Sequence, residues 1–269
     1  MAFLSELAER DATGEKAAIY AEIRRLGAVP MVALIFRHLA TLPGGIEWMW
    51  NAVGPAWRSG RLQEAAWRIA REAKLQPIAP VPREALAALG VDEDAMKEVR
   101  VVVDAYNGAN PVNLLTVTCL SQLLAGAKAT AALEERPWVP PPAPGPLVPM
   151  IDLATMPGEV AALFDLVSAP GNDGGPRVVQ SLYRHFGHRP GFLALLVTLL
   201  LPRFRDGTIE ESVQAIRAAM NKAAEALVPA LSAPPAPHPG VRVVLERFRS
   251  VIPQMIVVGA LIDRALPAR

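Results

Sequence analysis

The chain of 269 residues carries 27 lysines and arginines against 26 aspartates and glutamates, so its formal charge of +1 gives no electrostatic case for binding nucleic acid or an acidic membrane. The hydrophobic content of 52% is enough for a sizeable core, while the longest apolar stretch, residues 192–201, is too short to span a bilayer. A single cysteine, Cys119, excludes a disulfide framework and a paired-thiol redox site. We therefore expect a cytoplasmic protein without nucleic-acid or membrane partners.

Apolar residues recur at intervals near 3.6 along most of the chain, which predicts helices rather than strands. Asp92 lies just before one of these periodic segments and is the expected N-cap of its helix. Because prolines mostly separate the periodic segments, we expect them to end helices. The predicted helices cover residues 15–26, 61–74, 92–105, 159–167, 209–227 and 241–250.

A proline-rich stretch near the midpoint, RPWVPPPAPGPLVP at residues 136–149, predicts an extended linker. It separates residues 1–135 from residues 150–269. We expect these two parts to form one compact unit with a pocket between them.

The two parts repeat one another. FRHLATLPG at residues 36–44 returns as YRHFGHRPG at residues 183–191, a shift of 147 positions. Farther along, VRVVVDAYNGANP at residues 99–111 matches VRVVLERFRSVIP at residues 241–253, a shift of 142 positions. The order of elements therefore predicts an all-α fold of two tandem helical repeats related by pseudo-twofold symmetry.

The duplication separates structural candidates from functional ones. Residues that both halves share, such as His38 and His185, are explained by the shared fold. A single site between two halves must be lined unequally, so residues that break the symmetry are better functional candidates. The clearest break is Asn110, which matches Ile252. Its amide either caps a helix that breaks at Pro111 or contacts a ligand.

Two further breaks supply candidates. Trp48 and Trp50 lie where the second half has leucine and valine, and Trp48 is either a core residue or part of the wall of an apolar pocket. The glycine-rich stretch at residues 170–176 has no counterpart in the first half. It contains Asp173, which is a turn residue in the simplest interpretation and otherwise a carboxylate available to a site.

The motifs of common catalytic sites are absent from the sequence. It contains no GxSxG, HExxH, P-loop or dinucleotide-binding glycine motif. Its four histidines lack the spacing of metal ligands, and Cys119 is typical of a core residue on an apolar helix. We expect no metal and no cofactor.

Four segments resemble the group I 2-haloacid dehalogenases, the type that accepts both enantiomers. They are ATGEKAAIYAEIR, VPMVALIFRHLATLPGG, VRVVVDAYNGANPVNLL and PLVPMIDLAT, and the resemblance runs from about residue 12 to residue 200. It implies an all-helical protein of two repeats with the active site between them, and it suggests a homodimer. The ligand that it implies is a small 2-substituted carboxylic acid.

The resemblance also implies roles for individual positions. In the family, an aspartate on the first helix of the second repeat is the general base, and it activates a water that displaces halide with inversion. The position of that aspartate is Leu182 here, and the family's preceding serine is Ser181. The asparagine that positions the reactants is Asn110, and Met31 stands where the family has an aromatic residue.

Leucine cannot accept a proton, so three alternatives are open. His185, one turn beyond Leu182, or Asp173 could be the substitute base of a hydrolase. The chain could instead be a non-catalytic homologue that binds a small carboxylic acid or a protein partner in the pocket. A peroxidase-like redox protein is disfavoured because Cys119 has no second cysteine nearby. The surroundings of Leu182 separate the first two, since a polar pocket with a carboxylate or imidazole within hydrogen-bond reach of a water favours an enzyme and an apolar slot favours a binder.

Overall fold

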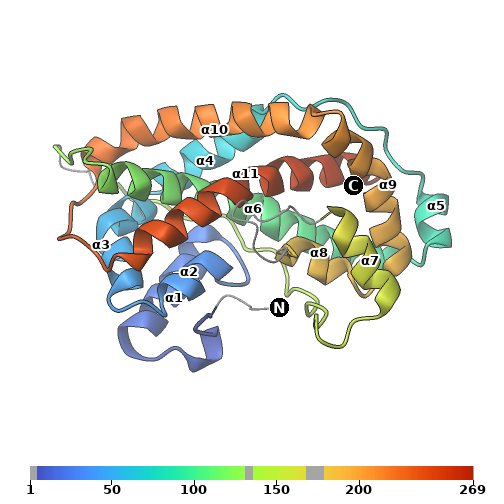
Figure 1. Ribbon diagram of the computed structural model, residues 1–269, viewed down its shortest axis with the longest axis horizontal. Helices are drawn as coiled ribbons and strands as arrows, with labels where there is room; N and C mark the ends of the chain where they lie inside the picture. Colours follow the sequence, from blue (N-terminus) through green and yellow to red (C-terminus); the bar gives the residue numbers. More distant parts are fainter. Residues whose placement is uncertain (1–4, 131–135, 168–178, 269) are drawn as a thin grey trace.

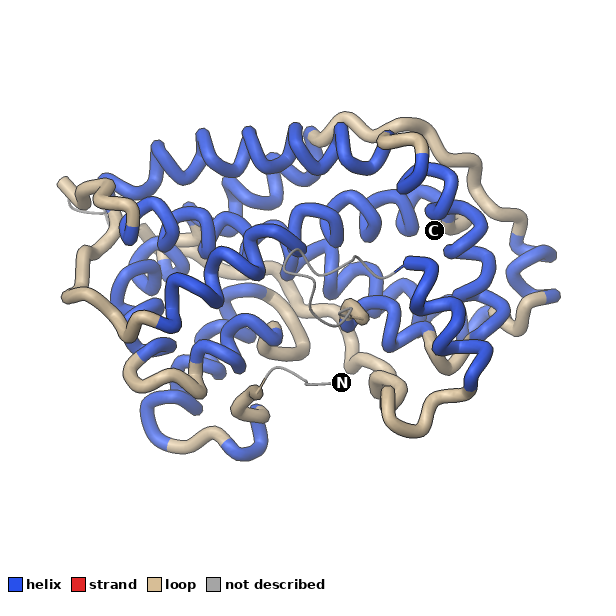
Figure 2. The backbone as a smooth tube through the Cα atoms, in the orientation of Figure 1, coloured by secondary structure: helices blue, strands red, loops and turns tan. Residues whose placement is uncertain are grey.

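The computed structural model describes residues 5–130, 136–167 and 179–268, and within these residues the fold is helical and without strands (Figure 2). Among the helices described, none combines the length and apolar character needed to cross a bilayer. Two 3-10 turns, η1 and η2, cover Glu9–Asp11 and Val228–Ala230. The helices are α1 Gly14–Gly27, α2 Leu34–Leu39, α3 Gly45–Arg58, α4 Arg61–Glu72, α5 Arg83–Ala88, α6 Glu93–Leu124, α7 Gly158–Val167, α8 Ser181–Phe186, α9 Pro190–Arg205, α10 Thr208–Leu227 and α11 Gly240–Ala265.

Two long helices, α6 and α11, form the centre of the molecule and pack along one another (Figure 1). Helices α4 and α10 pack against this pair. In Figure 1, α1, α2 and α3 lie at one end of the central pair, and α7, α8 and α9 lie at the other. One continuous hydrophobic core includes residues from both halves of the chain. The central pair therefore connects the two ends through buried apolar contacts.

Local sequence signals explain where several helices begin. The Asp92 side chain accepts a hydrogen bond from the Ala95 backbone N–H at 2.9 Å, which confirms Asp92 as the N-cap of α6. Gly60 and Gly207 precede α4 and α10 with φ angles of 71° and 85°, a left-handed conformation that glycine adopts without steric cost. The starts of α4, α6 and α10 are thus set by single residues.

The expectation that prolines end helices is wrong at four positions. A proline inside a helix costs a backbone hydrogen bond, but the apolar surface that the long helices bury outweighs this loss. Asn110 consequently does not cap a helix end, because α6 continues beyond it to Leu124. The four prolines inside helices are Pro55 in α3, Pro111 in α6, Pro202 in α9 and Pro253 in α11.

The two halves make matching contacts at matching places. The Nδ1–H of His38 donates to the Ser5 carbonyl oxygen at 2.5 Å, and that of His185 donates to the Val148 carbonyl oxygen at 2.6 Å. These contacts favour a structural role for both histidines. The pseudo-twofold repeat stays a prediction that they support. The accompanying backbone hydrogen bonds are Leu7 N–H to Arg37 O and Ile151 N–H to Arg184 O, each at 3.0 Å.

The proline-rich segment at residues 136–149 has no regular secondary structure; its beginning lies against the first half, and Val148 and Pro149 at its end contact histidines of the second half. The Trp138 ring covers Gly60 so closely that a Cβ atom there would overlap it. The same ring lies 6.3 Å from the Trp67 ring, measured between centroids. Aromatic packing therefore holds this segment on the surface of α4.

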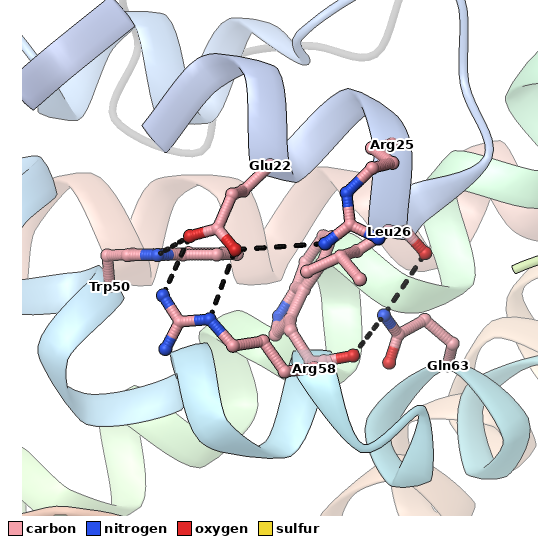
Figure 3. Close-up of polar contacts among 7 residues, drawn as sticks. Glu22, Arg25, Leu26, Trp50, Arg58 and Gln63 are labelled. Atoms are coloured by element: carbon pink, nitrogen blue, oxygen red, sulfur yellow. Dashed lines mark hydrogen bonds and ion pairs between the residues drawn. The ribbon is translucent and has the colours of Figure 1, made fainter. Parts of the chain in front are cut away.

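A polar cluster ties α1 to α3 and α4 (Figure 3). Glu22 on α1 accepts two hydrogen bonds from the Arg58 guanidinium, at 2.7 and 3.1 Å. Gln63 on α4 is fully buried, and its Nε2 donates to the carbonyl oxygens of Leu26 at 3.1 Å and Trp57 at 3.0 Å. A buried amide that is paired in this way fixes the end of α1.

Candidate functional site between α2, α6, α8 and α11

A small cavity of about 110 Å³ lies where α2, α6, α8 and α11 meet. The two halves of the chain contribute to its wall in equal numbers. Met31 and Val179 belong to the segments that lead into α2 and α8. The lining residues are Met31, Ala33, Leu34, Ile35, Tyr106, Ala109, Asn110, Asn113, Val179, Gln180, Ser181, Leu182, Phe248, Val251, Ile252 and Met255.

Nearly all the lining positions correspond between the halves. The polar side chains come from α6 of the first half and the start of α8 in the second, whereas the matching positions on α2 and α11 are apolar. The cavity is thus lined unequally, as a single site between two repeats requires. At the shift of 147 positions the pairs are Ala33 with Gln180, Leu34 with Ser181 and Ile35 with Leu182. At the shift of 142 positions they are Tyr106 with Phe248, Ala109 with Val251, Asn110 with Ile252 and Asn113 with Met255.

Four residues that the sequence predicts for the site line this cavity. Asn110 comes from the middle of α6 and is 8% exposed. Ser181 is the first residue of α8, and Leu182 beside it is fully buried. Met31 lies ahead of α2 and is partly buried. The fold therefore brings together residues from three distant parts of the sequence.

Of the other candidates, one lies away from this cavity and one lies outside the described residues. Trp48 lies on α3 within the hydrophobic core and does not contribute to the lining, so the structure does not bring it to the site. Asp173 and the rest of the glycine-rich stretch at residues 170–176 lie outside the described residues. A role for Asp173 as a substitute base stays a prediction.

His185 does not line the cavity but contacts a residue that does. Because its Nδ1–H donates to the Val148 carbonyl, the neutral ring presents Nε2 as an acceptor to the Tyr106 hydroxyl, 3.2 Å away. Burial lowers the pKa of the His185 imidazole, which favours the neutral form. The side chain of Ser181 lies near enough to Tyr106 to lower the pKa of its hydroxyl, against the larger opposite effect of burial. A chain of side chains therefore leads from the cavity to His185.

Two polar residues of the lining belong to no recognisable motif and were not predicted from the sequence. Gln180 is the N-cap residue of α8, and Tyr106 lies on α6 one turn before Asn110. The signal that finds them is the correspondence between the halves. Gln180 takes the place of Ala33 and Tyr106 takes the place of Phe248, so each adds a polar group at a position that is apolar in the other half.

Gln180 and Asn110 are buried with polar atoms that have no partner in the protein. Gln180 is 6% exposed, and neither its Nε2 nor its Oε1 forms a hydrogen bond. The Nδ2 of Asn110 is also without a partner. Buried polar groups are nearly always paired, and each one left unpaired costs about 1–3 kcal/mol. Both residues line the cavity, so their unpaired amide groups are candidates for contact with a polar molecule there.

The lining has few groups that could perform acid–base chemistry. None of the described residues that line it is an Asp, Glu, His, Lys or Arg. Tyr106 is ionisable, but burial raises the pKa of its hydroxyl, so it stays protonated near neutral pH. Most of the remaining wall is aliphatic, with Phe248 as a further ring. Leu182 consequently lies in an apolar slot.

Metal and thiol chemistry find no support elsewhere in the described part of the chain. No three His, Cys, Asp or Glu side chains there come close enough together to hold a metal ion. Cys119 is fully buried on α6, and burial raises the pKa of its thiol to about 12. Since the thiolate is the reactive form, this environment disfavours a redox role.

Comparisons with known proteins give one sequence relative and several similar structures, and no family model matches the chain. The chain is 33% identical over 202 residues to a "2-haloacid dehalogenase, configuration-inverting" from Alcaligenes xylosoxydans xylosoxydans, a match that covers 72% of this chain. It spans 64% of that relative, less than two thirds of its length.

The similar structures are those of D-2-haloacid dehalogenase. One is a complex with L-LA, with a TM-score of 0.71 and 16% identity, and another is a mutant in complex with D-2-CPA, with a TM-score of 0.70 and 16% identity. Both alignments cover 98% of this chain and 94% of the other. The chain is thus homologous in sequence to a configuration-inverting 2-haloacid dehalogenase and has the all-helical fold of D-2-haloacid dehalogenase.

Proposed function

We propose that this chain is a member of the dehalogenase-like hydrolase family whose cavity binds a small 2-substituted carboxylic acid, or a close derivative, without the family's aspartate-dependent dehalogenation. The observation that carries this proposal is the fully buried Leu182 in the wall of the cavity, at the position where the resemblance expects the general base. The homology in sequence supports the family.

The chemistry of the lining favours binding over hydrolysis. Direct attack of water on the halogen-bearing carbon needs a base within hydrogen-bond reach of that water. Leu182 has no atom that can accept a proton. Asn110, Gln180 and Ser181 are neutral groups that orient a ligand but do not remove its protons. The described lining therefore supplies polar contacts and lacks a base.

The size of the cavity favours a small molecule over a protein partner. A volume of about 110 Å³ corresponds to roughly four water molecules at ~30 Å³ each. A small organic acid fits such a space, whereas a peptide segment needs a longer groove. We therefore place the ligand among small acids and their derivatives.

Hydrolysis with a substitute base is the second candidate, and the chain of side chains from Ser181 through Tyr106 to His185 favours it. In this alternative, the attacking water passes a proton to Ser181, Ser181 passes its own hydroxyl proton to Tyr106, and Tyr106 passes its own to the free Nε2 of His185. The lowered pKa of His185 makes it a weak base in this position, which is why binding is the preferred function. Asp173 is a further candidate base outside the described residues.

The test is halide release from racemic 2-chloropropionate by three proteins, the unmodified chain, Leu182→Asp and Leu182→Asn. We expect no release by the unmodified chain or by Leu182→Asn, and release by Leu182→Asp, because only that variant restores a carboxylate at the wall. Leu182→Asn is the matched control, since it has nearly the same shape and polarity without a base.

Two results would contradict the proposal of binding without dehalogenation. Release by the unmodified chain that is lost in His185→Asn or in Asp173→Asn would assign the base to the residue replaced. Release by the unmodified chain that survives both substitutions would show that a different group activates the water. A folded Leu182→Asp protein that releases no halide would argue that the cavity does not bind the acid at all.

We further propose that the two halves arose by duplication and that residues 136–149 join them. The matched contacts of His38 and His185, and the paired positions of the cavity lining, support this origin. A homodimer, suggested by the family resemblance, is also a proposal, and sedimentation equilibrium of the purified chain would test it.

A further inference from the structure

Three unpaired polar atoms share the wall of one small cavity. They are the Nδ2 of Asn110 and both amide atoms of Gln180, on side chains that are 8% and 6% exposed. An unpaired atom in this position is costly, and these three belong to two residues that line the same cavity. A ligand that supplies the missing partners would account for all three.

The chemical types of these atoms define what the ligand must offer. The Nδ2 of Asn110 and the Nε2 of Gln180 are donors and require an acceptor, whereas the Oε1 of Gln180 is an acceptor and requires a donor. This requirement does not depend on which way the Gln180 amide is turned, because either orientation presents one donor and one acceptor. A carboxylate has acceptors only, so it would leave the Gln180 oxygen facing another oxygen.

The charges around the cavity also disfavour an anion. Among the described residues that line it there is no lysine, arginine or histidine, so a bound carboxylate would lose its water without gaining a counterion from them. Arg37 and Arg184 act on Tyr106 from outside the lining. Both are already engaged, Arg37 with Glu6 at 2.9 Å and Arg184 with a backbone carbonyl oxygen at 3.2 Å.

We propose that the ligand is a small uncharged carboxamide, whose carbonyl oxygen accepts from the Nδ2 of Asn110 and the Nε2 of Gln180 and whose N–H₂ group donates to the Oε1 of Gln180. This inference rests on the proposed function, which is that the cavity binds a small acid derivative. The aliphatic wall, including Leu182 and Ile252, takes the substituted carbon chain. The cavity volume of about 110 Å³ limits that chain to a few carbon atoms.

The test compares 2-chloropropionamide with 2-chloropropionate, two molecules of nearly equal size that differ in charge and in the N–H₂ donor. Isothermal titration calorimetry with the full chain near neutral pH measures both affinities. We expect the amide to bind about 100-fold more tightly than the acid, because only the acid brings an unpaired charge into the cavity. No halide is expected from either compound.

The alternative outcomes separate this inference from the proposed function. Equal or tighter binding of the acid would overturn the carboxamide assignment and leave the proposed function in place. No binding of either compound, up to the solubility limit, would overturn both. Halide release from either compound would contradict binding without dehalogenation, whatever the affinities are.

A variant tests the role of Gln180 directly. Gln180→Met keeps the length of the side chain and removes both amide atoms, and it breaks no hydrogen bond within the protein. We expect it to fold, by circular dichroism, and to bind the amide at least about tenfold more weakly. Gln214→Met, the same substitution on the exposed face of α10, is the control and should bind like the unmodified chain. Unchanged amide binding by Gln180→Met would overturn the assignment.

Discussion

Replacing Gln180 with methionine should stabilise the protein, although the replacement lies in the candidate site. Both amide atoms of Gln180 are buried without a partner in the fold, so their removal relieves a desolvation cost of about 1–3 kcal/mol. For a chain of this length, about 1 kcal/mol corresponds to a rise of roughly 2–4 °C in Tm. Urea unfolding followed by circular dichroism measures the change in the free energy of unfolding.

Gln63 provides the matched control because it is another buried glutamine with a different environment. Its Oε1 is unpaired like that of Gln180, but its Nε2 donates to the carbonyl oxygens of Leu26 and Trp57. The Trp57 oxygen also accepts from the Gly60 backbone N–H, so Gln63→Met leaves one buried acceptor, the Leu26 carbonyl oxygen, without its partner, and we expect it to destabilise the fold by about 1–3 kcal/mol. The same change from glutamine to methionine should therefore raise the free energy of unfolding at Gln180 and lower it at Gln63.

The refuting result is a loss of stability in Gln180→Met comparable to that in Gln63→Met. Such a loss would mean that the Gln180 amide already has partners of equal quality in the protein without ligand. The argument that the cavity reserves polar atoms for a ligand would then fail, and with it the basis for assigning a carboxamide.

Three further predictions concern other parts of the fold. Gly60→Ala should lower the free energy of unfolding in urea by at least about 1 kcal/mol more than Gly207→Ala does. Both glycines have a positive φ, but only a Cβ at Gly60 meets the Trp138 ring. Equal losses in the two variants would contradict this packing. Burial lowers the pKa of His185 in the folded protein, so below about pH 6.5 the unfolded chain binds a proton that the folded chain does not. The free energy of unfolding should therefore fall as the pH drops from about 7.5 to 5.5, and it should fall less in His185→Asn. Identical pH profiles of the two proteins would contradict the lowered pKa. Cys119, with a pKa of about 12 and full burial, should react with a thiol reagent only after unfolding; rapid labelling of the native protein would refute this.

The sequence predicted the helical fold because helices are specified by near neighbours. The N-cap at Asp92 and the periodic apolar faces are local features, and the structure confirms both. The extent of α6 and α11 was underestimated because Pro111 and Pro253 resemble helix ends in a linear reading. Whether a helix tolerates an internal proline depends on the partner that it packs against, which local patterns do not reveal.

Only part of the site could be predicted from the sequence. Asn110, Ser181, Leu182 and Met31 were singled out by alignment, either with the other half or with a family, and all four line the cavity. Gln180 was not predicted, because what distinguishes it is burial without hydrogen-bond partners, and only the folded structure shows this. Such a property is created by distant helices and has no signature in the nearby sequence.

The pairing of lining positions has a consequence for the history of the site. Suppose that both halves descend from a single ancestral gene. A symmetric dimer of the first half alone would then have Asn110 and Asn113 twice in its cavity, opposite Ala33 and Leu34. It would have no glutamine and no serine there. A dimer of the second half would display Gln180 and Ser181 twice and would lack the asparagines. On the proposed duplication, the mixed set exists only in the fused chain, so the ligand preference that we propose for this cavity requires the fusion of the two halves.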